Sequence, residues 1–397
     1  MNVLSLFDGM SCGQQALERA GIKVDKYFAS EIDKYAIQVT MANYPDTIQL
    51  GSVVDVDGYA LPKIDLLIGG SPCQSFSFAG KRKGMATTDE QEILTLEHYL
   101  QLKADGFEFQ GQSYLFWEFM RLLYEVKPKY FLLENVEMGE KWERVLTQAI
   151  GVNALHINSA LVSAQNRKRI YFTNIGMEAS GLFNYQVSII QKPKDRKILL
   201  KDILESEVED KYFLSDKAVG SIIKNENNLQ KSNINPYKSN PLQSPGHACG
   251  IYKGASYICH NTMPRSSTTG KGGTGHLSRN DGKTYCLDTG NTNAVEVREV
   301  KQLSTNNKSN GGTQPYQQDR IYDVNGISPA LQAQLPNGST MINTSRIRRL
   351  TPLECMRLQT VNDNYKMPVS DSQKYKMLGN GWTIEVISHI FKYISLL

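Results

Sequence analysis

Short apolar runs typical of β-strands alternate with helical patterns over the first 200 residues. VLSLF precedes SCGQQALERAG, KYFASEI precedes DKYAIQVTMANY, and IDLLIGG precedes SYLFWEFMRLLYEV and KYFLLENV. Strands and helices in this order predict right-handed βαβ units. We therefore expect an α/β fold with a doubly wound, mostly parallel sheet, helices on both faces, and ligands at the carboxyl ends of the strands.

The pattern changes at about residue 201. KDILESEVEDKYFLSDKAVGSIIKN predicts one or two acidic helices, and small and polar residues then dominate to about residue 345, with the strand candidates YICH, TYCLD, RIYDV and STMI. Helical patterns return in RRLTPLECMRLQ, which begins with capping residues, and in the amphipathic TIEVISHIFKYISLL. We predict a catalytic and cofactor-binding domain over residues 1–200 and 370–397, and a smaller, loop-rich domain over residues 201–369.

Composition narrows the class of protein. The chain of 397 residues is 40% hydrophobic and 21% charged. No window approaches the eighteen consecutive apolar residues of a membrane span, so we expect a cytoplasmic protein that does not enter a membrane. We also expect a monomer. The cysteines form no C-x-x-C pair and are too sparse for a disulfide scaffold, which predicts six free thiols: Cys12, Cys73, Cys249, Cys259, Cys286 and Cys355.

Charge is unevenly distributed along the chain. The net charge of +4 is small, but no Asp or Glu occurs between residues 227 and 280. The same span contains Lys231, Lys238, Lys253, Arg265, Lys271 and Arg279. A segment with charges of one sign is a candidate for contact with nucleic-acid phosphates, although a solvated basic loop is the alternative.

The first strand is followed by a glycine-containing turn that leads into a helix, Phe7-Asp8-Gly9-Met10-Ser11-Cys12-Gly13. Gly9 and Gly13 allow a tight turn and close approach of a ligand to the backbone. The second strand ends at Glu31, where doubly wound folds place an acid on ribose hydroxyls. Because the pattern is not G-x-G-x-x-G, this turn alone is weak evidence for a cofactor site.

Three further segments place reactive side chains at strand ends. Ile68-Gly69-Gly70-Ser71-Pro72-Cys73 puts a cysteine on a rigid turn with polar neighbours, which argues against an inert core thiol. Glu134 follows an apolar run, and it lies at the same edge as Cys73 if the two strands are parallel neighbours. In QNRKRIYF, alternation predicts that Gln165, Arg167 and Arg169 share one face of a strand.

The ordered blocks FDGMSCG, GGSPCQSFSFAGKRKG, ENV, QNRKRIYF, RRLTPLECMRLQ and GNGWT extend over nearly the whole chain. In content and order they resemble the DNA (cytosine-5)-methyltransferases of bacterial or phage type. The resemblance implies a Rossmann-like methyltransferase fold, S-adenosylmethionine as cofactor and double-stranded DNA as partner. It also implies a role in a restriction-modification system or in phage DNA protection.

The resemblance further implies a covalent mechanism. The thiolate of Cys73 attacks carbon 6 of a cytosine, so that carbon 5 can take the methyl group of S-adenosylmethionine. The carboxylate matching Glu134 contacts ring nitrogen 3 and the exocyclic amine. The arginine matching Arg167 contacts the carbonyl oxygen at position 2 and lowers the pKa of the thiol, and Arg169 supports the same pocket. A base then removes the proton from carbon 5, and water is one candidate.

Cofactor contacts carry over from the resemblance one residue at a time. They are Phe7, Asp8, Gly9, Ser11, Gly13, Glu31, Ile32, Ser52, Val53, Pro72, Leu115, Asn380 and Trp382. One departure affects the adenine contact, because Gly51-Ser52-Val53 stands where the family often has Gly-Asp-Ile or Gly-Asp-Val. Ser52 or a shifted Asp55 could supply that contact.

The target base must leave the duplex to reach the cysteine, so a loop that closes over it is expected after Cys73. Candidates for DNA contact in and beyond this loop are Ser75, Phe76, Lys81, Arg82, Gln165, Lys253, Arg265, Lys271 and Arg279. The loop-rich region matches the family's target-recognition domain, with a basic reader span over residues 227–345. Residues 87–112 form an extra segment with no assigned role.

Three other functions compete with this interpretation. RNA methylation uses the same chemistry in a close branch of the family, but that branch lacks a large recognition insert. Methylation of an exocyclic amine needs no thiol, and a protein that has lost catalysis should have lost one of Cys73, Glu134 and Arg167. We expect no metal site, because the H-x-C-x9-C-H spacing around Cys249 matches no common zinc pattern.

Overall fold

The computed structural model of the chain describes ten stretches of sequence. They are residues 1–72, 92–109, 111–180, 185–213, 256–261, 277–279, 283–284, 286, 293–298 and 346–394. Cys73 and most of the expected DNA-contacting residues lie outside these stretches.

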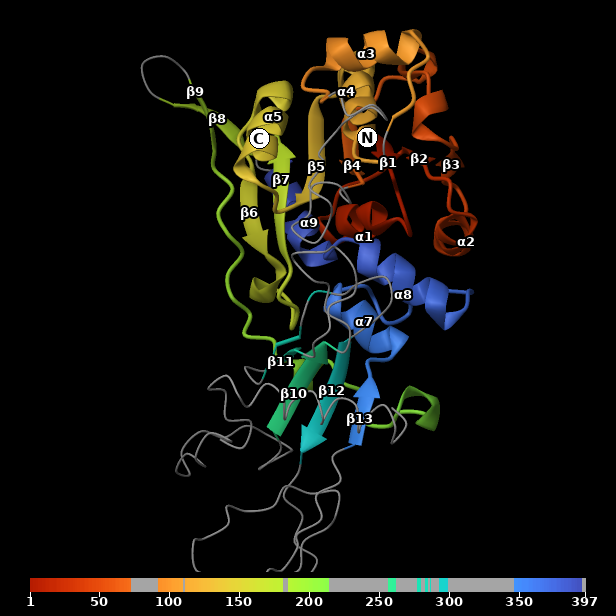
Figure 1. Cartoon of the computed structure of the whole chain (residues 1–397), viewed down its shortest axis with the longest axis vertical. Helices are drawn as coiled ribbons and strands as arrows, with labels where there is room; N and C mark the ends of the chain where they lie inside the picture. The colour runs from red at the N-terminus through yellow and green to blue at the C-terminus, as the bar shows by residue number, and fades with distance from the viewer. Residues whose placement is uncertain are drawn as a thin grey trace, which may run out of the picture.

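The main sheet has seven strands in the order β3-β2-β1-β4-β5-β7-β6. The strands are β1 Asn2–Leu6, β2 Lys26–Ser30, β3 Ile48–Gln49, β4 Leu66–Gly70, β5 Tyr130–Val136, β6 Leu155–Asn158 and β7 Lys168–Thr173. Strands β3, β2, β1, β4 and β5 pair in parallel, whereas β7 runs antiparallel to β5 and β6. The predicted doubly wound, mostly parallel sheet is confirmed (Figure 1).

Helices pack on both faces of this sheet and form two separate hydrophobic cores. The helices are α1 Cys12–Arg19, α2 Lys34–Asn43, α3 Leu96–Ala104, α4 Leu115–Val126, α5 Glu140–Ile150, α7 Pro352–Leu358, α8 Asp371–Asn380 and α9 Ile384–Phe391. Alternating strand side chains point to opposite faces. Val3 and Leu132 therefore lie in the core of α1 and α9, whereas Leu4 and Leu133 lie in the core of α3, α4 and α5.

A second, antiparallel sheet lies beyond α7, below the main sheet in Figure 1. Its order is β11-β10-β12-β13, with β10 Ser256–Asn261, β11 Leu277–Arg279, β12 Asn293–Arg298 and β13 Arg346–Arg349. Strand β10 confirms the candidate YICH. Of the candidate TYCLD, Thr284 forms an isolated bridge to Gln165, and Tyr285, Leu287 and Asp288 lie outside the described residues. The candidates RIYDV and STMI lie outside the described residues. A small hairpin pairs β8 Met177–Ser180 with β9 Tyr185–Ser188.

The prediction of acidic helices after residue 201 is wrong for its described part, residues 201–213. This part contains only two 3-10 helices, η4 Leu200–Asp202 and η5 Asp210–Tyr212. Tertiary contacts take the place of helical hydrogen bonds here. The Glu205 N–H donates to the buried Glu354 carboxylate at 2.9 Å, and the Leu200 side chain enters the core.

The two helices predicted near the C-terminus are confirmed. Helix α7 begins at a capping box in which Thr351 Oγ accepts the Glu354 N–H and the Glu354 carboxylate accepts the Thr351 N–H. Helix α9 contributes Ile384 and Phe391 to the same core that contains Leu358 of α7. This region of the chain is thus packed into the main domain.

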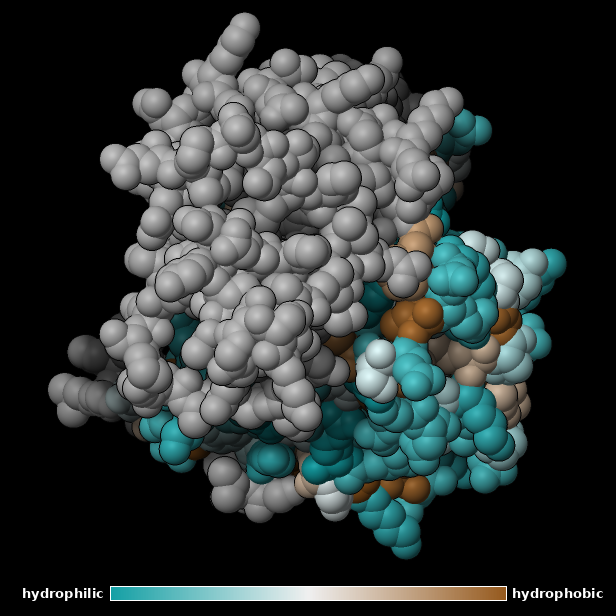
Figure 2. Space-filling model, turned by 90° about the horizontal axis from the view of Figure 1, so that it is seen from below, coloured by the Kyte–Doolittle hydropathy of each residue, from teal (hydrophilic) through white to brown (hydrophobic). Residues whose placement is uncertain are grey.

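Seen from the end that carries the antiparallel sheet, the described part of the surface is mostly hydrophilic, with some apolar side chains among the polar ones (Figure 2). Within the described part of the chain, no helix is long and apolar enough to cross a bilayer.

Candidate functional site

The turn after β1 is conformationally strained. Phe7, Gly9 and Ser11 have φ values of 57°, 58° and 59°. Glycine adopts this left-handed conformation without cost, but Phe7 and Ser11 adopt it at a cost in free energy. Hydrogen bonds hold the turn, from Asp8 N to Ser30 O at 3.3 Å and from Ser11 N to Asp8 O at 3.1 Å. Strain that the fold maintains in this way is typical of ligand-binding sites.

Glu31, at the end of β2, organises the backbone around this turn. Its Oε2 accepts the Gly9 N–H at 2.8 Å, and its Oε1 accepts the N–H groups of Ile32 and Asp33 at 2.8 Å. A carboxylate has about four lone-pair directions, so three amides leave room for a further donor such as a hydroxyl. The neighbouring Ile32 side chain is 72% exposed. Strand β2 thus ends in an acceptor beside an apolar surface, which fits a ribose and the face of an adenine.

Asp8 and Gly13 fix the base of the same turn. The Asp8 carboxylate accepts Tyr27 Oη at 2.8 Å and Ser11 Oγ at 2.7 Å, and burial raises its pKa from 3.8 to about 6. At Gly13 a Cβ atom would lie 2.5 Å from Ile68 Cδ1 and 2.7 Å from Tyr27 Oη. Only glycine lets α1 approach the sheet this closely, so Gly13 acts through packing.

The other expected cofactor residues come from elements around this edge. Val53 is buried in η1, Val53–Asp55, and Ser52 immediately precedes that 3-10 helix. Leu115 is the first residue of α4 and is half-buried, as is Pro72 after β4. The exposed Asn380 ends α8. The turn after α8 carries Trp382, whose Nε1 would lie 2.8 Å from a Cβ atom at Gly70.

On the other side of the edge, the buried Glu134 and the half-buried Arg169 form an ion pair. Strands β4 and β5 are parallel neighbours, as the sequence prediction required, and Gly70 pairs in register with Glu134. Arg169 Nε lies 3.0 Å from Glu134 Oε1, and the two side chains are 15% and 11% exposed. The structure thus brings Glu134 and Arg169 together beside Gly70, three residues before Cys73 in the sequence.

Arg167 faces different partners from those of Arg169. Arg167 as a whole is 3% exposed, and its guanidinium donates to Gly379 O at 3.2 Å and to Gly381 O at 2.9 Å. These carbonyls flank the turn between α8 and Trp382. Arg167 therefore joins the start of β7 to the turn that carries the tryptophan.

The expected shared strand face of Gln165, Arg167 and Arg169 is wrong, because β7 begins only at Lys168. Before that residue the chain is held by other partners. Asn166 N–H donates to Thr284 O at 3.2 Å, and Gln165 is 0% exposed with its amide donating to Leu358 O at 3.2 Å. A DNA contact by Gln165 stays a prediction.

Cys286 is a neighbour of both arginines that the sequence analysis did not identify. Its Sγ accepts from Arg167 Nη1 at 3.2 Å and lies 3.7 Å from Arg169 Nη2. Burial alone would raise the pKa of this thiol, but the two positive charges outweigh burial and hold the pKa below its usual 9.0. No local pattern in the sequence marks it, because the contact to Arg167 joins residues 119 positions apart.

The remaining expected site residues lie outside the described part of the chain: Cys73, Ser75, Phe76, Lys81, Arg82, Lys253, Arg265 and Lys271. Arg279 lies in β11, where its backbone pairs with Cys259. Their roles stay predictions.

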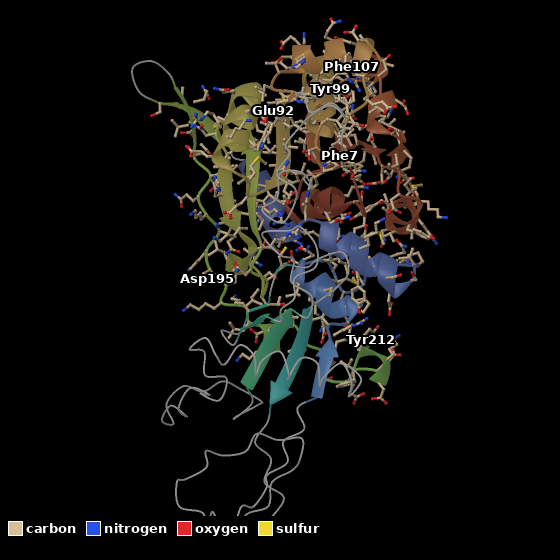
Figure 3. The ribbon with its side chains drawn as sticks, in the orientation of Figure 1. Phe7, Glu92, Tyr99, Phe107, Asp195 and Tyr212 are labelled. Atoms are coloured by element: carbon tan, nitrogen blue, oxygen red, sulfur yellow. The ribbon has the colours of Figure 1, made fainter. Side chains whose placement is uncertain are left out.

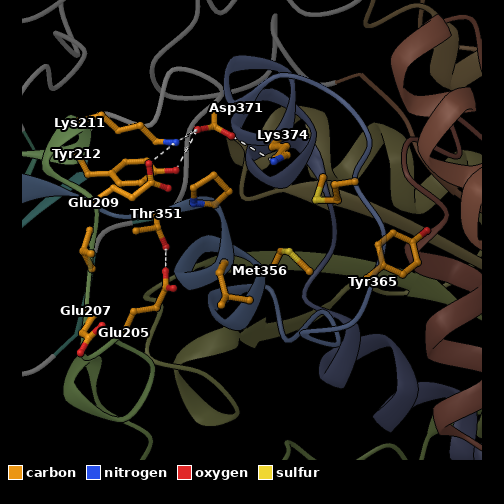
Figure 4. A pocket seen from close by; sticks show the side chains of 14 residues that line it. Glu205, Glu207, Glu209, Lys211, Tyr212, Thr351, Met356, Tyr365, Asp371 and Lys374 are labelled. Atoms are coloured by element: carbon orange, nitrogen blue, oxygen red, sulfur yellow. Dashed lines mark hydrogen bonds and ion pairs between the residues drawn. The ribbon is translucent and has the colours of Figure 1, made fainter.

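A separate pocket of about 400 Å³ lies between residues 205–212 and helices α7 and α8 (Figure 4). Several of its charged side chains have protein partners. Lys211 contacts Glu209 at 3.1 Å, and Lys374 contacts Asp371 at 3.2 Å. Among the described residues, no group of three or more His, Cys, Asp or Glu side chains is arranged to hold a metal ion.

A family model and a curated relative each match nearly the whole chain. The family model of the C-5 cytosine-specific DNA methylases matches residues 1–396. The chain is 30% identical to the orphan methyltransferase M.SPRI of Bacillus phage SPR over 459 aligned residues, covering 99% of this chain and 97% of the relative. It is 27% identical to the type II methyltransferase M1.ScrFI of Lactococcus lactis subsp. cremoris, covering 93% of this chain and 71% of the relative.

Solved structures share the fold at low sequence identity. The S. pombe Dnmt2 methyltransferase has a TM-score of 0.51 at 16% identity and covers 100% of this chain, with 97% of its own length matched. The Entamoeba histolytica methyltransferase EhMeth has a TM-score of 0.54 at 13% identity, covering 99% of this chain and 97% of its own. At these identities the likeness shows the fold alone.

Proposed function

The chain belongs to the C-5 cytosine-specific DNA methylase family and is a DNA (cytosine-5)-methyltransferase, and from this we propose how its own residues carry out the reaction. The enzyme methylates carbon 5 of a cytosine that has left the DNA stack. The observation that carries the site assignment is the Glu134–Arg169 pair at 3.0 Å, at the strand edge where the chain leads to Cys73.

The proposed reaction uses Cys73 as nucleophile. Its thiolate forms a bond to carbon 6, and the displaced electron pair makes carbon 5 the attacking atom. S-adenosylmethionine, when bound, supplies the methyl group. Removal of the carbon 5 proton then returns the electron pair and breaks the bond between Cys73 and carbon 6. Glu134 would meet ring nitrogen 3 and the exocyclic amine, and would offset the charge that develops on the ring during the reaction.

We assign the contact with the carbonyl oxygen of the base to Arg169 rather than to Arg167. Arg169 pairs with Glu134 and also donates to Lys168 O at 2.7 Å, so its guanidinium is held beside the carboxylate that would meet the base. The Arg167 guanidinium already donates to the carbonyls of Gly379 and Gly381. Arg167 is thus a positioning residue for the turn that carries Trp382.

The cofactor assignment is supported by the turn after β1 and by the free acceptor direction of Glu31. The exposed Ile32 side chain fits the face of an adenine. Phe7, Asp8, Gly9, Ser11 and Gly13 would shape the turn, and the remaining contacts are proposed for Ser52, Val53, Pro72, Leu115, Asn380 and Trp382.

We further propose duplex DNA as the substrate of a cytoplasmic monomer that acts in restriction-modification or in phage DNA protection. The phage and type II relatives support this setting. The separate antiparallel sheet supports a recognition domain within residues 201–369. Leu350 and Leu358 share a core with α1 and α9, which favours a C-terminal boundary of that domain near β13.

Bisulfite sequencing of DNA from cells that express the chain tests this function. We expect protected cytosines in one sequence context with the native protein. We expect none with Cys73→Ser, although that variant should still shift a DNA probe on a native gel. Native-like methylation by Cys73→Ser would overturn the covalent mechanism. Methylated transfer RNA with no protected cytosine in DNA would identify an RNA methyltransferase instead.

A further inference from the structure

Glu118, on α4, is a fully buried carboxylate with three donors. It is 0% exposed and accepts Tyr99 Oη at 2.5 Å, Lys103 Nζ at 2.6 Å and Arg121 Nε at 2.7 Å. Burial, followed by the hydrogen bond to Glu118, raises the pKa of Tyr99, so its hydroxyl stays a donor. Tyr99 and Lys103 lie on α3, within the extra segment. This segment is thus tied to the main domain by a buried, charge-assisted network.

Arg121 extends this network to the segment assigned to the cofactor. Its Nη1 donates to both Glu125 oxygens at 2.8 and 2.9 Å, and its Nη2 donates to Val53 O at 3.1 Å. The Glu125 carboxylate also accepts the Gly58 N–H at 2.9 Å. The donors of this guanidinium therefore hold the 3-10 helices η1 and η2, Gly58–Ala60, against α4.

An aromatic cluster forms a second connection to the cofactor side. The ring of Phe109 lies 5.0 Å from that of Tyr99 and 4.7 Å from that of Tyr114. Tyr114 directly precedes Leu115, the first residue of α4. Tyr99 thus takes part in both connections, and Figure 3 places it with Phe107 at the α3 end of the molecule, away from the antiparallel sheet.

We propose that the segment of residues 92–109 positions the adenine side of the cofactor pocket, with Tyr99, Lys103 and Arg121 as positioning residues that act through Val53 and Leu115. This inference rests on the proposed assignment of Val53 and Leu115 to the cofactor. Ser52 stands where the family often has an aspartate, so the side-chain contact to the adenine is changed in this chain. A backbone at Val53 that Arg121 holds in place can keep the geometry of the adenine contact there.

The test measures the affinity of the purified full chain for S-adenosylmethionine by calorimetry. We expect Tyr99→Phe to weaken the affinity for S-adenosylmethionine about fivefold. Arg121→Lys should weaken it more strongly, because lysine lacks the planar guanidinium that bonds to several partners at once. The kcat at saturating cofactor and the affinity for a DNA duplex should stay within twofold of the native values. Hydrogen exchange at the Asp55 amide, which bonds to Ser52 O, should become faster without any cofactor present.

Lys141→Met is the matched control. Lys141 also tethers the segment, through an exposed contact of 2.6 Å to Glu92, but that contact leads to α5 and not to Val53. It should leave cofactor affinity unchanged. Unchanged affinity in Tyr99→Phe and Arg121→Lys, or equal weakening by Lys141→Met, would overturn the inference. If the native chain itself binds no S-adenosylmethionine, the proposed function fails instead.

Discussion

The two sides of the site are built in different ways. On the cofactor side, the contacts join residues near one another in the chain, such as Gly9 and Glu31, which are 22 positions apart. On the side of the target base, Arg167 binds the carbonyl of Gly381, 214 positions away. The turn after β1 and its contacts to Glu31 can therefore form from one βαβ unit. The partners of Arg167, and the proposed cofactor contacts Asn380 and Trp382, are present only when the C-terminal helices are in place.

This difference predicts different consequences of substitution. Changes on the base side should affect the chemistry or the stability of the whole domain. Changes on the cofactor side should have smaller, local effects, because backbone hydrogen bonds of the turn after β1 remain.

Glu134→Gln should have the largest effect. The amide keeps the size of the carboxylate but removes its charge, so it no longer balances the charge that develops on the base. We expect kcat to fall by about 10² to 10³. Single-turnover methylation measures this loss, and the affinity for S-adenosylmethionine should stay within twofold. Glu140→Gln, at an 89% exposed carboxylate on α5, is the control. A native kcat in Glu134→Gln would remove Glu134 from the mechanism.

Arg167→Met should act mainly on stability. It leaves the carbonyls of Gly379 and Gly381 without their guanidinium donor. We expect the free energy of unfolding to fall by about 2–4 kcal/mol, measured by urea denaturation. Arg144→Met, at a 67% exposed side chain, should change it by less than about 0.5 kcal/mol. Native stability with a lost kcat would instead support direct contact of Arg167 with the base.

The same contrast explains what the sequence could predict. The positions of Glu31 and Glu134 at the sheet edge were predictable, because each follows the apolar run of its strand, and the ends of parallel strands meet at one edge. The partners of Arg167 were not, since every residue has a carbonyl and nothing in the sequence marks those of Gly379 and Gly381. Cys286 was missed for the same reason.

In the fold, alternating apolar runs predicted the main sheet. The acidic helices failed because the buried Glu354 carboxylate binds the Glu205 amide, a tertiary contact that local helix propensity does not contain. The sequence did not predict helix α3 or its hydrogen bonds to Glu118. The residue pattern shows polar residues in this segment, but it does not show that the Glu118 carboxylate on α4 accepts hydrogen bonds from three donors.

Asp8→Asn should produce the smallest effect, and it concerns pH. Burial raises the pKa of Asp8 from 3.8 to about 6, so between these values the folded chain holds a proton that the unfolded chain has lost. Stability from this group is complete below pH 3.8 and is lost as the pH rises through 6. The rise of the pKa from 3.8 to about 6 corresponds to at most about 3 kcal/mol. Because the Asp8 side chain is only half-buried in the folded chain, we expect a contribution of about 1 kcal/mol.

Urea denaturation at pH 4, 5, 6 and 7 measures this loss, which Asp8→Asn should abolish. Asp33→Asn is the opposite-sign control, because a hydrogen bond from Lys376 lowers the pKa of Asp33 and places its titration below pH 3.8. That variant should lose stability by a similar amount at every pH between 4 and 7, since Asp33 is ionised throughout. Parallel pH profiles for Asp8→Asn and the native chain would mean that the carboxyl is hydrated, and that the cofactor side is less closely packed than its hydrogen bonds indicate.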